Sequence, residues 1–437
     1  MKYFGTDGIR DKAKTLIKKR IGYYVGLSFY RFKHDQKAVF IARDTRESGE
    51  VITQQIINGL TSVGFDVYDI GVYPSPVLAY LTEYKQAQGI MITASHNPYY
   101  DNGIKIFDSG KKLSKDTEKL IEEVIEQEYS IKKVASKGQV KEYKSVMKNY
   151  LSLYNNLLEK TDLNICLDLA NGAAISTAKD IFSEISDNLN FMADSANGKN
   201  INKNSGSTDI SKLKEYVIEN NCDLGIAFDG DADRLIVIDN LGEVCDGDFL
   251  IYLFASYYKA HKKLKNNFVA LSKMCNIGII KALKDKHIDV IQTDVGDKYI
   301  TRALEENEGI LGGENSGHII NKPLLSTGDG VLNAVFLIKV MNYYKLPLSN
   351  LKKQVNYYPD KLVNLKNIDK DLANHKVITD LVNQYRLELA DEGKVLVRAS
   401  GTEPLIRISV SAPTTRQINE IIKDIKTNLK QLGKGEK

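Results

Sequence analysis

The sequence repeats one pattern three times: an apolar segment of strand length, an amphipathic helical segment and a second apolar segment. The copies occupy residues 38–71, 163–193 and 267–294. The helical segments are expected over residues 46–64 in the first copy and 173–185 in the second. In the first copy, the apolar residues at helical spacing are Val51, Ile52, Ile56, Ile57, Leu60 and Val63. Strands that alternate with helices build α/β layers, so the pattern predicts three related α/β domains with a common architecture. The residues of the copies differ, so no common chemistry is expected.

The C-terminal part of the sequence follows a different pattern. Residues 394–401 and 404–412 are predicted to form two strands around a tight loop. A helix is expected next, because Ile418, Ile422 and Leu429 recur at helical spacing. These elements predict a smaller α+β domain. The four expected domains are 1–148, 149–248, 249–362 and 363–437.

Composition excludes several classes of partner. A chain of 437 residues is too long for one hydrophobic core, which agrees with several domains. Lys and Arg total 60 against 56 for Asp and Glu, a balance that argues against binding nucleic acid or an anionic membrane. The four cysteines are widely spaced without a CxxC pair, as in a protein with reduced thiols. Because no apolar leader or membrane-length apolar segment is present, we expect a soluble cytoplasmic protein.

The segment DGDADR lies between two apolar runs, which predicts a loop between two strands. Three carboxylates at alternate positions, Asp229, Asp231 and Asp233, repel one another, and a divalent cation would relieve that repulsion. Ligands that are all oxygen atoms favour Mg²⁺ over zinc. The alternative is a solvated acidic turn. An EF-hand is excluded because Arg234 and Asn240 stand where its loop requires glycine and glutamate.

The segment RASGTEPLIR, from Arg398 to Arg407, suits an anion. Ser400, Gly401 and Thr402 can form a concave loop whose backbone N–H groups and hydroxyls point at a phosphate. The two arginines supply fork-shaped cations for the same group. The alternative is a hairpin turn with surface arginines.

The segment GGENSGH combines Glu314, Asn315, Ser316 and His318 in a glycine-containing loop. A carboxylate beside short polar side chains suits the hydroxyls of a sugar. Taken alone this motif is weak, because it also fits a polar connection. His318 equally fits a hydrogen-bonded structural histidine.

The segment TASHNPYYDNGIK begins at Thr93, close to the end of the apolar run 89–94. The run predicts a strand that delivers Ser95 to its end, where Pro98 prevents a regular continuation. No Walker or Rossmann glycine motif occurs, and no G-x-S-x-G surrounds any serine. A protein with a metal loop and a phosphate loop but no nucleotide motif needs another phosphoryl source, and Ser95 is the best candidate. The alternative is a serine that caps a strand–helix junction.

These motifs, in this order, resemble the signatures of the α-D-phosphohexomutase superfamily. With KYFGTDGIR near the start, the resemblance extends from Tyr3 to about Ile408. The sequence is most similar to the bacterial members that act on glucosamine phosphate. Members of the superfamily have three related α/β domains and a smaller C-terminal domain around a central active-site cleft, in agreement with the domain pattern above.

The resemblance implies an enzyme that interconverts glucosamine 6-phosphate and glucosamine 1-phosphate for the synthesis of UDP-N-acetylglucosamine and cell-wall precursors. Phosphorylated Ser95 would give its phosphoryl group to the sugar phosphate, and the hexosamine 1,6-bisphosphate would turn over in the cleft. That bisphosphate, or glucose 1,6-bisphosphate, would also prime the dephosphorylated enzyme. A homodimer is an expected assembly.

The resemblance also implies roles for individual residues. Mg²⁺ would be held by Ser95 and the three aspartates of DGDADR. Lys105 and His318 would be the candidates for proton transfer, and Arg10 would stabilise the transferring charge. The substrate-binding residues would be Arg234, Glu314, Ser316, Arg398, Ser400, Gly401, Thr402 and Arg407.

Four residues depart from the superfamily pattern: Asp11 replaces glycine, Ala399 proline, Asn315 glutamine or serine, and Lys298 arginine. Ala399 lacks the rigidity of proline, and Lys298 lacks the forked geometry of arginine. Three other functions fit parts of the sequence. They are a phosphoglucomutase/phosphomannomutase with the same mechanism, a non-catalytic sugar-phosphate sensor, and a phosphatase that uses Ser95.

Overall fold

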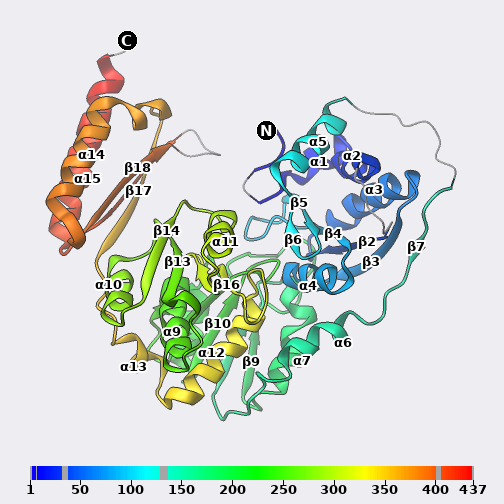
Figure 1. Ribbon diagram of the computed structural model, residues 1–437, viewed down its shortest axis with the longest axis horizontal. Coiled ribbons are helices and arrows are strands. Elements are labelled where there is room, and N and C mark those ends of the chain that lie inside the picture. Colours follow the sequence, from blue (N-terminus) through cyan, green and yellow to red (C-terminus); the bar gives the residue numbers. More distant parts are fainter. Residues whose placement is uncertain (1, 6, 32–37, 128–135, 400–404, 436–437) are drawn as a thin grey trace. The chain divides into compact units, whose positions relative to one another are not determined.

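The computed structural model describes residues 2–5, 7–31, 38–127, 136–399 and 405–435. The chain divides into two compact units (Figure 1). The first unit contains Met1–Met274 and Asp289–Lys352, and the second contains Cys275–Ile288 and Lys353–Lys437. The three predicted strand–helix–strand copies are present as folded α/β layers, and the smaller C-terminal sheet lies in the second unit.

The N-terminal layer is a mixed sheet with seven described strands, in the order β1-β5-β4-β2-β3-β7, with β6 paired to β5. Its strands are β1 (Ile9–Lys12), β2 (Ala38–Arg43), β3 (Asp66–Val72), β4 (Gln88–Ile92), β5 (Asp101–Asp108), β6 (Lys111–Lys112) and β7 (Val140–Lys141). Its helices are α1 (Ala13–Lys18), α2 (Ile21–Ser28), η1 (Phe29–Arg31), α3 (Gly49–Ser62), α4 (Ser75–Lys85) and α5 (Lys115–Glu126). Strand β2 pairs parallel with β3 and β4, whereas β4 and β5 are antiparallel.

Both faces of this sheet are buried because the side chains of β2 alternate between two hydrophobic clusters. Val39 and Ile41 belong to a cluster with residues of α2, α3 and α5, whereas Phe40 and Ala42 join residues of α4. Figure 1 shows α2 and α3 on one side of the sheet and α4 on the other. Burial on both faces explains why residues 38–42 are a continuous apolar run rather than an alternating one.

The second layer is a sheet with five described strands in the order β12-β11-β10-β8-β9. Its strands are β8 (Ile165–Asp168), β9 (Leu189–Met192), β10 (Leu224–Phe228), β11 (Leu235–Asp239) and β12 (Val244–Cys245). Its helices, with those of the preceding connection, are α6 (Val146–Leu151), η2 (Ser152–Tyr154), η3 (Ala173–Ser176), α7 (Ala178–Ser183) and α8 (Ser211–Glu219). Strands β10 and β11 are antiparallel, and Phe228 faces Leu235, so the DGDADR segment is the loop that joins them, as predicted.

The third layer is a sheet with four described strands in the order β14-β13-β15-β16. Its strands are β13 (Phe268–Ser272), β14 (Asp289–Thr293), β15 (Leu311–Gly313) and β16 (Ile319–Asn321). The accompanying helices in the first unit are α9 (Gly247–Ala260), α11 (Asp297–Glu306), α12 (Gly330–Tyr344) and α13 (Leu348–Lys352). The side chains of Asp246 and Asp329 accept backbone N–H groups at the starts of α9 and α12, which fixes where these helices begin. The GGENSGH segment joins the antiparallel strands β15 and β16.

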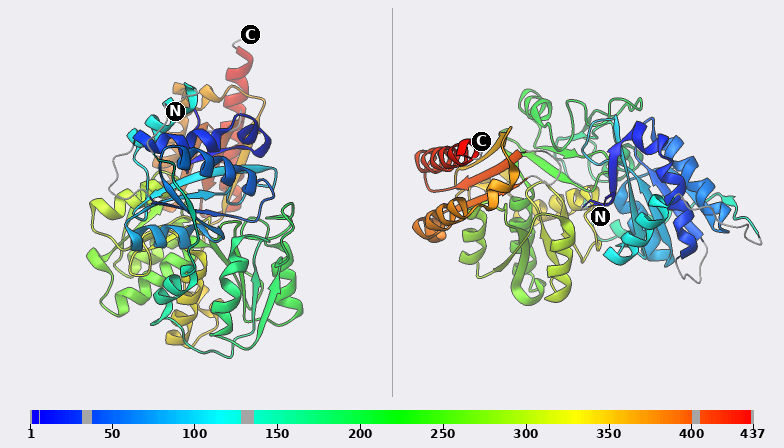
Figure 2. Two further views of the ribbon diagram at one scale, coloured as in Figure 1. Left: turned by 90° about the vertical axis from the view of Figure 1, so that its right-hand side faces the viewer. Right: turned by 90° about the horizontal axis from the view of Figure 1, so that it is seen from above.

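The second unit contains α10 (Ile277–Asp285) and an antiparallel sheet in the order β17-β19-β18. The remaining elements of this unit are β17 (Asp360–Lys366), η5 (Lys370–Asn374), α14 (Lys376–Leu389), η6 (Ala390–Glu392), β18 (Lys394–Ala399), β19 (Leu405–Ser411) and α15 (Thr415–Gly435). In the first unit, η4 (Lys265–Asn267) precedes β13 of the third layer. Ile406, Ile408 and Val410 of β19 pack in one cluster with buried residues of α14 and α15, and Figure 2 shows both helices on the same side of the sheet. The predicted hairpin and C-terminal helix are therefore present. No helix in the described ranges combines the length and apolar character needed to cross a membrane.

Candidate active site

Ser95 lies in the loop that connects β4 to β5. The strand predicted for 89–94 ends at Ile92, and the following residues form the loop instead. Ser95 is 2% exposed and has a φ of 52°, in the left-handed region. Its backbone N–H donates to Thr93 Oγ1 at 2.8 Å, and its Oγ donates to Asp229 Oδ2 at 2.6 Å. The local backbone thus directs the Ser95 hydroxyl at the acidic loop.

The acidic loop between β10 and β11 brings its three carboxylates together. One oxygen each from Asp229, Asp231 and Asp233 lies within 4.8 Å of the others, and all three residues are buried. Ala232 has a φ of 55°, so the chain turns back on itself between the second and third aspartates. This turn lets residues at alternate positions converge on one point.

The free oxygens of this loop fit a hard cation. Oδ1 of Asp231 and Oδ1 of Asp233 are buried and, among the described residues, have no hydrogen-bond partner. Buried carboxylate oxygens without partners are costly, and a divalent cation would satisfy them. Because every available ligand is an oxygen atom, Mg²⁺ fits this set of residues better than zinc.

Lys105 on β5 places its ammonium group among three carboxylates. Its Nζ lies 2.8 Å from Asp231 Oδ2 and 3.0 Å from Asp233 Oδ2. A third contact, at 2.9 Å, joins it to Asp7 Oδ2 from the N-terminal segment. Burial lowers the pKa of Lys105, but Asp231, Asp233 and Asp7 raise this pKa well above its usual value, so the group is an ammonium ion.

Burial and neighbouring charges move the pKa values of the outer aspartates in opposite directions. Burial, together with Asp233 and Asp231, raises the pKa of Asp229 above its usual value. Burial also acts to raise the pKa of Asp233, but Lys105 and His318 lower it well below the usual range. Repulsion within the triad is therefore relieved unevenly, and a bound cation would favour the ionised form of Asp229.

The GGENSGH loop contributes His318 to the edge of the acidic loop. His318 Nδ1 lies 3.6 Å from Asp233 Oδ1, too long for a hydrogen bond, and Nε2 lies 3.8 Å from Asp297 Oδ2. Glu314 accepts the Gly296 N–H at 2.8 Å, while Ser316 Oγ is buried and has no hydrogen-bond partner in the described part of the chain. The loop therefore offers a histidine and a hydroxyl that its own contacts leave unsatisfied.

Two guanidinium groups lie beside the Ser95 loop. Arg10 Nη1 donates to Asn97 Oδ1 at 3.3 Å, and Arg234 Nε lies 3.9 Å from Asp229 Oδ2. Burial and these two arginines lower the pKa of His96 to about 3, so the side chain next to Ser95 is neutral. The positive charge around the hydroxyl favours an anionic ligand.

The predicted phosphate loop belongs to the second unit. Arg398 on β18 and Arg407 on β19 face each other across the hairpin. Ser400, Gly401 and Thr402 lie outside the described residues. The hairpin itself is as predicted, and the anion-binding role of these residues stays a prediction.

Of the four departures from the superfamily pattern, Lys298 alone lines the recess beside the acidic loop. Asp11 is exposed and accepts the N–H of Lys12, and Ala399 is the last residue of β18. Asn315 is exposed. Lys298 on α11 has its Nζ over the Tyr299 ring, 5.2 Å from the ring centroid. None of these four is within the triad or the Ser95 loop.

Several residues that the sequence did not single out complete the site. Asp7 joins Lys105 to Lys112, which also pairs with Asp297. Ser75 at the start of α4 donates its hydroxyl to Asp231 Oδ2 and its backbone N–H to Asp231 O. The segment KYFGTDGIR was a signal for Asp7, but Lys112 and Ser75 lie in no motif.

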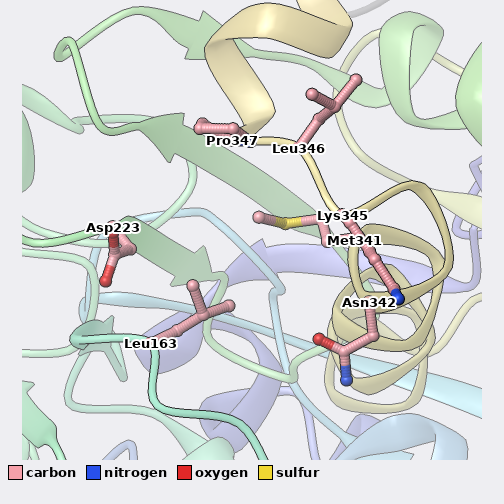
Figure 3. A pocket seen from close by; sticks show the side chains of 7 residues that line it. All are labelled: Leu163, Asp223, Met341, Asn342, Lys345, Leu346 and Pro347. Carbon is pink, nitrogen blue, oxygen red and sulfur yellow. The ribbon is translucent and has the colours of Figure 1, made fainter.

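One hollow in the first unit lies away from this site. It has a volume of about 370 Å³, and its lining residues are Leu163, Asp223, Met341, Asn342, Lys345, Leu346 and Pro347 (Figure 3). None of these seven is a predicted site residue. A smaller recess is lined partly by Asp7, Lys105, Lys112 and Lys298, and its charged walls adjoin the acidic loop. The chemistry favours the smaller recess over the larger hollow.

Family comparisons cover most of the chain. The phosphoglucomutase/phosphomannomutase α/β/α domain I matches residues 1–132, domain II residues 141–242, domain III residues 246–358 and the C-terminal domain residues 362–427. The chain is 39% identical to phosphoglucosamine mutase of Halalkalibacterium halodurans, with 98% of this chain and 99% of the relative covered. It is also 39% identical to phosphoglucosamine mutase of Listeria monocytogenes, with 96% of each covered.

Solved structures share the fold at lower sequence identity. A phosphoglucomutase/phosphomannomutase family protein from Burkholderia thailandensis has a TM-score of 0.80 at 21% identity, with 98% of this chain and 97% of that chain covered. N-acetylphosphoglucosamine mutase of Aspergillus fumigatus, solved with GlcNAc-6P and magnesium, has a TM-score of 0.64 at 14% identity, with 99% and 96% covered. Since four successive domain matches and full-length relatives at 39% identity agree, the chain belongs to the phosphoglucomutase/phosphomannomutase family of α-D-phosphohexomutases.

Proposed function

We propose that the chain is a phosphoglucosamine mutase, an isomerase that interconverts glucosamine 6-phosphate and glucosamine 1-phosphate. The observation that carries the proposal is the 2.6 Å hydrogen bond from Ser95 Oγ to Asp229 Oδ2, which joins the expected phosphoryl carrier to the acidic triad. Relatives with this name are 38–40% identical over nearly their whole length, which supports glucosamine as the sugar.

The proposed reaction has two transfers. In the first, the bond between phosphorus and Ser95 Oγ breaks while a bond forms between phosphorus and the free sugar hydroxyl oxygen. Lys105 and His318 are the two candidates for proton transfer, and because Lys105 is already an ammonium ion, His318 in its neutral form would accept the hydroxyl proton. After the bisphosphate turns over, its other phosphoryl group moves to Ser95 Oγ, and the proton returns to the sugar oxygen that is released. Serine is thereby phosphorylated again at the end of each cycle.

Positioning and charge carry most of this chemistry, because the transition state of phosphoryl transfer is loose. Arg10 and the ammonium group of Lys105 would offset the charge on the equatorial phosphoryl oxygens. Arg234, Glu314 and Ser316 would contact the sugar. The phosphate that does not react would be held by Arg398, Ser400, Gly401, Thr402 and Arg407.

Mg²⁺ is part of the proposal, with Ser95, Asp229, Asp231 and Asp233 as its ligands. The support is the oxygen-only donor set and its two buried oxygens without partners. When bound, the cation would supply Lewis-acid stabilisation of the oxygen charge at Ser95. Priming by hexosamine 1,6-bisphosphate or glucose 1,6-bisphosphate, a homodimeric assembly and a cytoplasmic location complete the proposal.

Steady-state kinetics with three substrates test this function. We expect a higher kcat/KM for glucosamine 6-phosphate than for glucose 6-phosphate or mannose 6-phosphate. Ser95→Ala should abolish turnover and the phosphorylated mass species, whereas Ser62→Ala, at the half-buried last residue of α3, should change neither. A preference for a neutral sugar would replace the proposal with a phosphoglucomutase/phosphomannomutase. Release of inorganic phosphate would indicate a phosphatase, and absence of turnover with all three sugars would indicate a sensor.

A further inference from the structure

A buried arginine donates hydrogen bonds to the backbone of the Ser95 loop. Arg46 has no exposed side-chain surface, and its guanidinium donates to four backbone carbonyl oxygens of this loop. Nη2 donates to Ser95 O at 3.0 Å and to Asn97 O at 2.8 Å. Nη1 donates to Pro98 O and, at 3.1 Å, to Asp101 O. One rigid fork therefore fixes the whole turn that carries the nucleophile.

Asp44 closes a circuit of hydrogen bonds between Arg46 and Ser95. Its Oδ2 accepts from Arg46 Nε at 2.9 Å and from Thr93 Oγ1 at 2.6 Å. The same Thr93 oxygen accepts the Ser95 N–H at 2.8 Å. Asp44 has no exposed side-chain surface, so these bonds lie away from solvent. Both backbone groups of Ser95 are thus tied to the Asp44–Arg46 pair.

A second donor reaches the same carbonyl oxygens from another layer. Asn202 follows β9 in the second α/β layer, and its Nδ2 donates to Ser95 O at 2.8 Å and to Asn97 O at 3.1 Å. Each of these two oxygens therefore accepts from both Arg46 and Asn202. The loop is held from inside its own layer and from the layer that carries the acidic triad.

These contacts explain how Ser95 keeps an unfavourable backbone conformation. A residue other than glycine adopts a left-handed conformation at a cost, and it persists only where the surroundings over-determine it. At Ser95 the left-handed turn is what aims Oγ at Asp229 while the carbonyl oxygen points at Arg46 and Asn202. Loss of these hydrogen bonds would let the loop adopt a less strained conformation and move the hydroxyl away from the triad.

We propose that Arg46 is a positioning residue for phosphoryl transfer. It acts with Asp44 and Asn202 to hold Ser95 Oγ at a fixed position beside the acidic triad. This inference rests on the proposed mutase function. Ser95 must occupy the same place when it gives up one phosphoryl group and when it receives the other, so a displaced loop impairs both transfers. A misplacement of about 1 Å costs about a hundredfold in rate.

Arg46→Lys is the principal test, because lysine keeps the positive charge but cannot serve four carbonyl oxygens as a fork. We expect kcat for glucosamine 6-phosphate to fall by about a hundredfold while KM stays within about twofold, because Arg46 has no exposed side-chain surface with which to contact a substrate. Asn202→Ala should lower kcat by a smaller factor. The double variant should lose less than the product of the two single losses, because both side chains serve Ser95 O and Asn97 O.

Arg43→Lys is the matched control, since Arg43 lies on the adjacent strand and pairs with Asp69 instead of the loop. It should match the wild type in kcat, KM and melting temperature. A folded Arg46→Lys protein with wild-type kcat would overturn the inference. If Arg46→Lys does not fold, wild-type kcat in folded Asn202→Ala would overturn it. A wild-type enzyme without mutase turnover would instead overturn the proposed function.

Discussion

Replacement of Lys105 by methionine tests whether one buried ammonium group compensates the acidic site. Its Nζ lies 2.8, 3.0 and 2.9 Å from carboxylate oxygens of Asp231, Asp233 and Asp7, and the residue is 3% exposed. Methionine keeps a similar side-chain length and removes the charge. The variant leaves three carboxylates facing one another without their common partner.

The expected loss of stability follows from these distances. At an effective dielectric constant of about 20, each attraction is worth about 6 kcal/mol. Desolvation of the ions offsets most of this gain, and removal of one partner from a buried pair costs about 3–5 kcal/mol. For a unit of about 340 residues, unfolding entropy gives about 0.7 kcal/mol per degree. We therefore expect the melting temperature of Lys105→Met to fall by about 4–7 °C in EDTA.

Mg²⁺ should narrow the difference in melting temperature between Lys105→Met and the wild type. In the variant no ammonium group competes with the cation for the carboxylates, so the variant should bind Mg²⁺ more tightly. A ligand at one hundred times its Kd stabilises the folded state by about 2.7 kcal/mol, so tighter Mg²⁺ binding by the variant restores part of the loss. The assay is thermal unfolding of both proteins in EDTA and in excess Mg²⁺. Lys111→Met, at a side chain that is 72% exposed, should match the wild type in both. An unchanged melting temperature in EDTA, or a difference that widens with Mg²⁺, would refute this reasoning.

Two further predictions concern the close approach of the DGDADR loop to the Ser95 loop and the hydrogen bonds that Glu122 accepts from residues 2–4. Gly230→Ala should lower kcat by about a hundredfold, because the added Cβ would lie 2.5 Å from Ser95 O and displace the Ser95 loop. Gly433→Ala is the control, because the atom nearest to its added Cβ would be 3.7 Å away. A wild-type rate for Gly230→Ala would contradict the prediction. Burial raises the pKa of Glu122, but hydrogen bonds from the N–H groups of residues 2–4 bring this pKa below its usual value. A carboxylate with a lowered pKa stabilises the fold above its usual pKa and loses this effect as the pH falls through the lowered value. Hydrogen-exchange protection of residues 2–4 should therefore fall as the pH drops below the usual range of a glutamate pKa, and already at neutral pH in Glu122→Gln. Protection that is independent of both changes would contradict this account.

The sequence predicted the layers well because the relevant patterns are local. Apolar residues at spacings of two and of three to four mark the faces of strands and helices within a short window. Helix boundaries depend on more. The expected helix 46–64 begins at Gly49, because Arg46 turns into the Ser95 loop instead of the helix. The helix expected over 173–185 is interrupted at Thr177, where a 3₁₀ turn gives way to α7.

The candidate site was predictable only where its members share a motif. The three aspartates at alternate positions predict a carboxylate cluster from the sequence alone. In the structure they converge because the chain turns at Ala232. The partners from distant parts of the chain are different. Asp7 meets Lys105, and Asn202 meets Ser95, across about one hundred residues of sequence, and no periodicity encodes such long-range pairs. The role of each candidate residue in catalysis stays a prediction.

The left-handed backbone at Ser95 also restricts which alcohol can serve there. A β-branched side chain is a severe outlier at positive φ, so threonine would distort the turn although its hydroxyl has the same reactivity. Asparagine or glycine would tolerate the turn but has no hydroxyl to esterify. The main chain, more than the reaction, thus narrows the phosphate ester formed at this position to that of a short, unbranched alcohol.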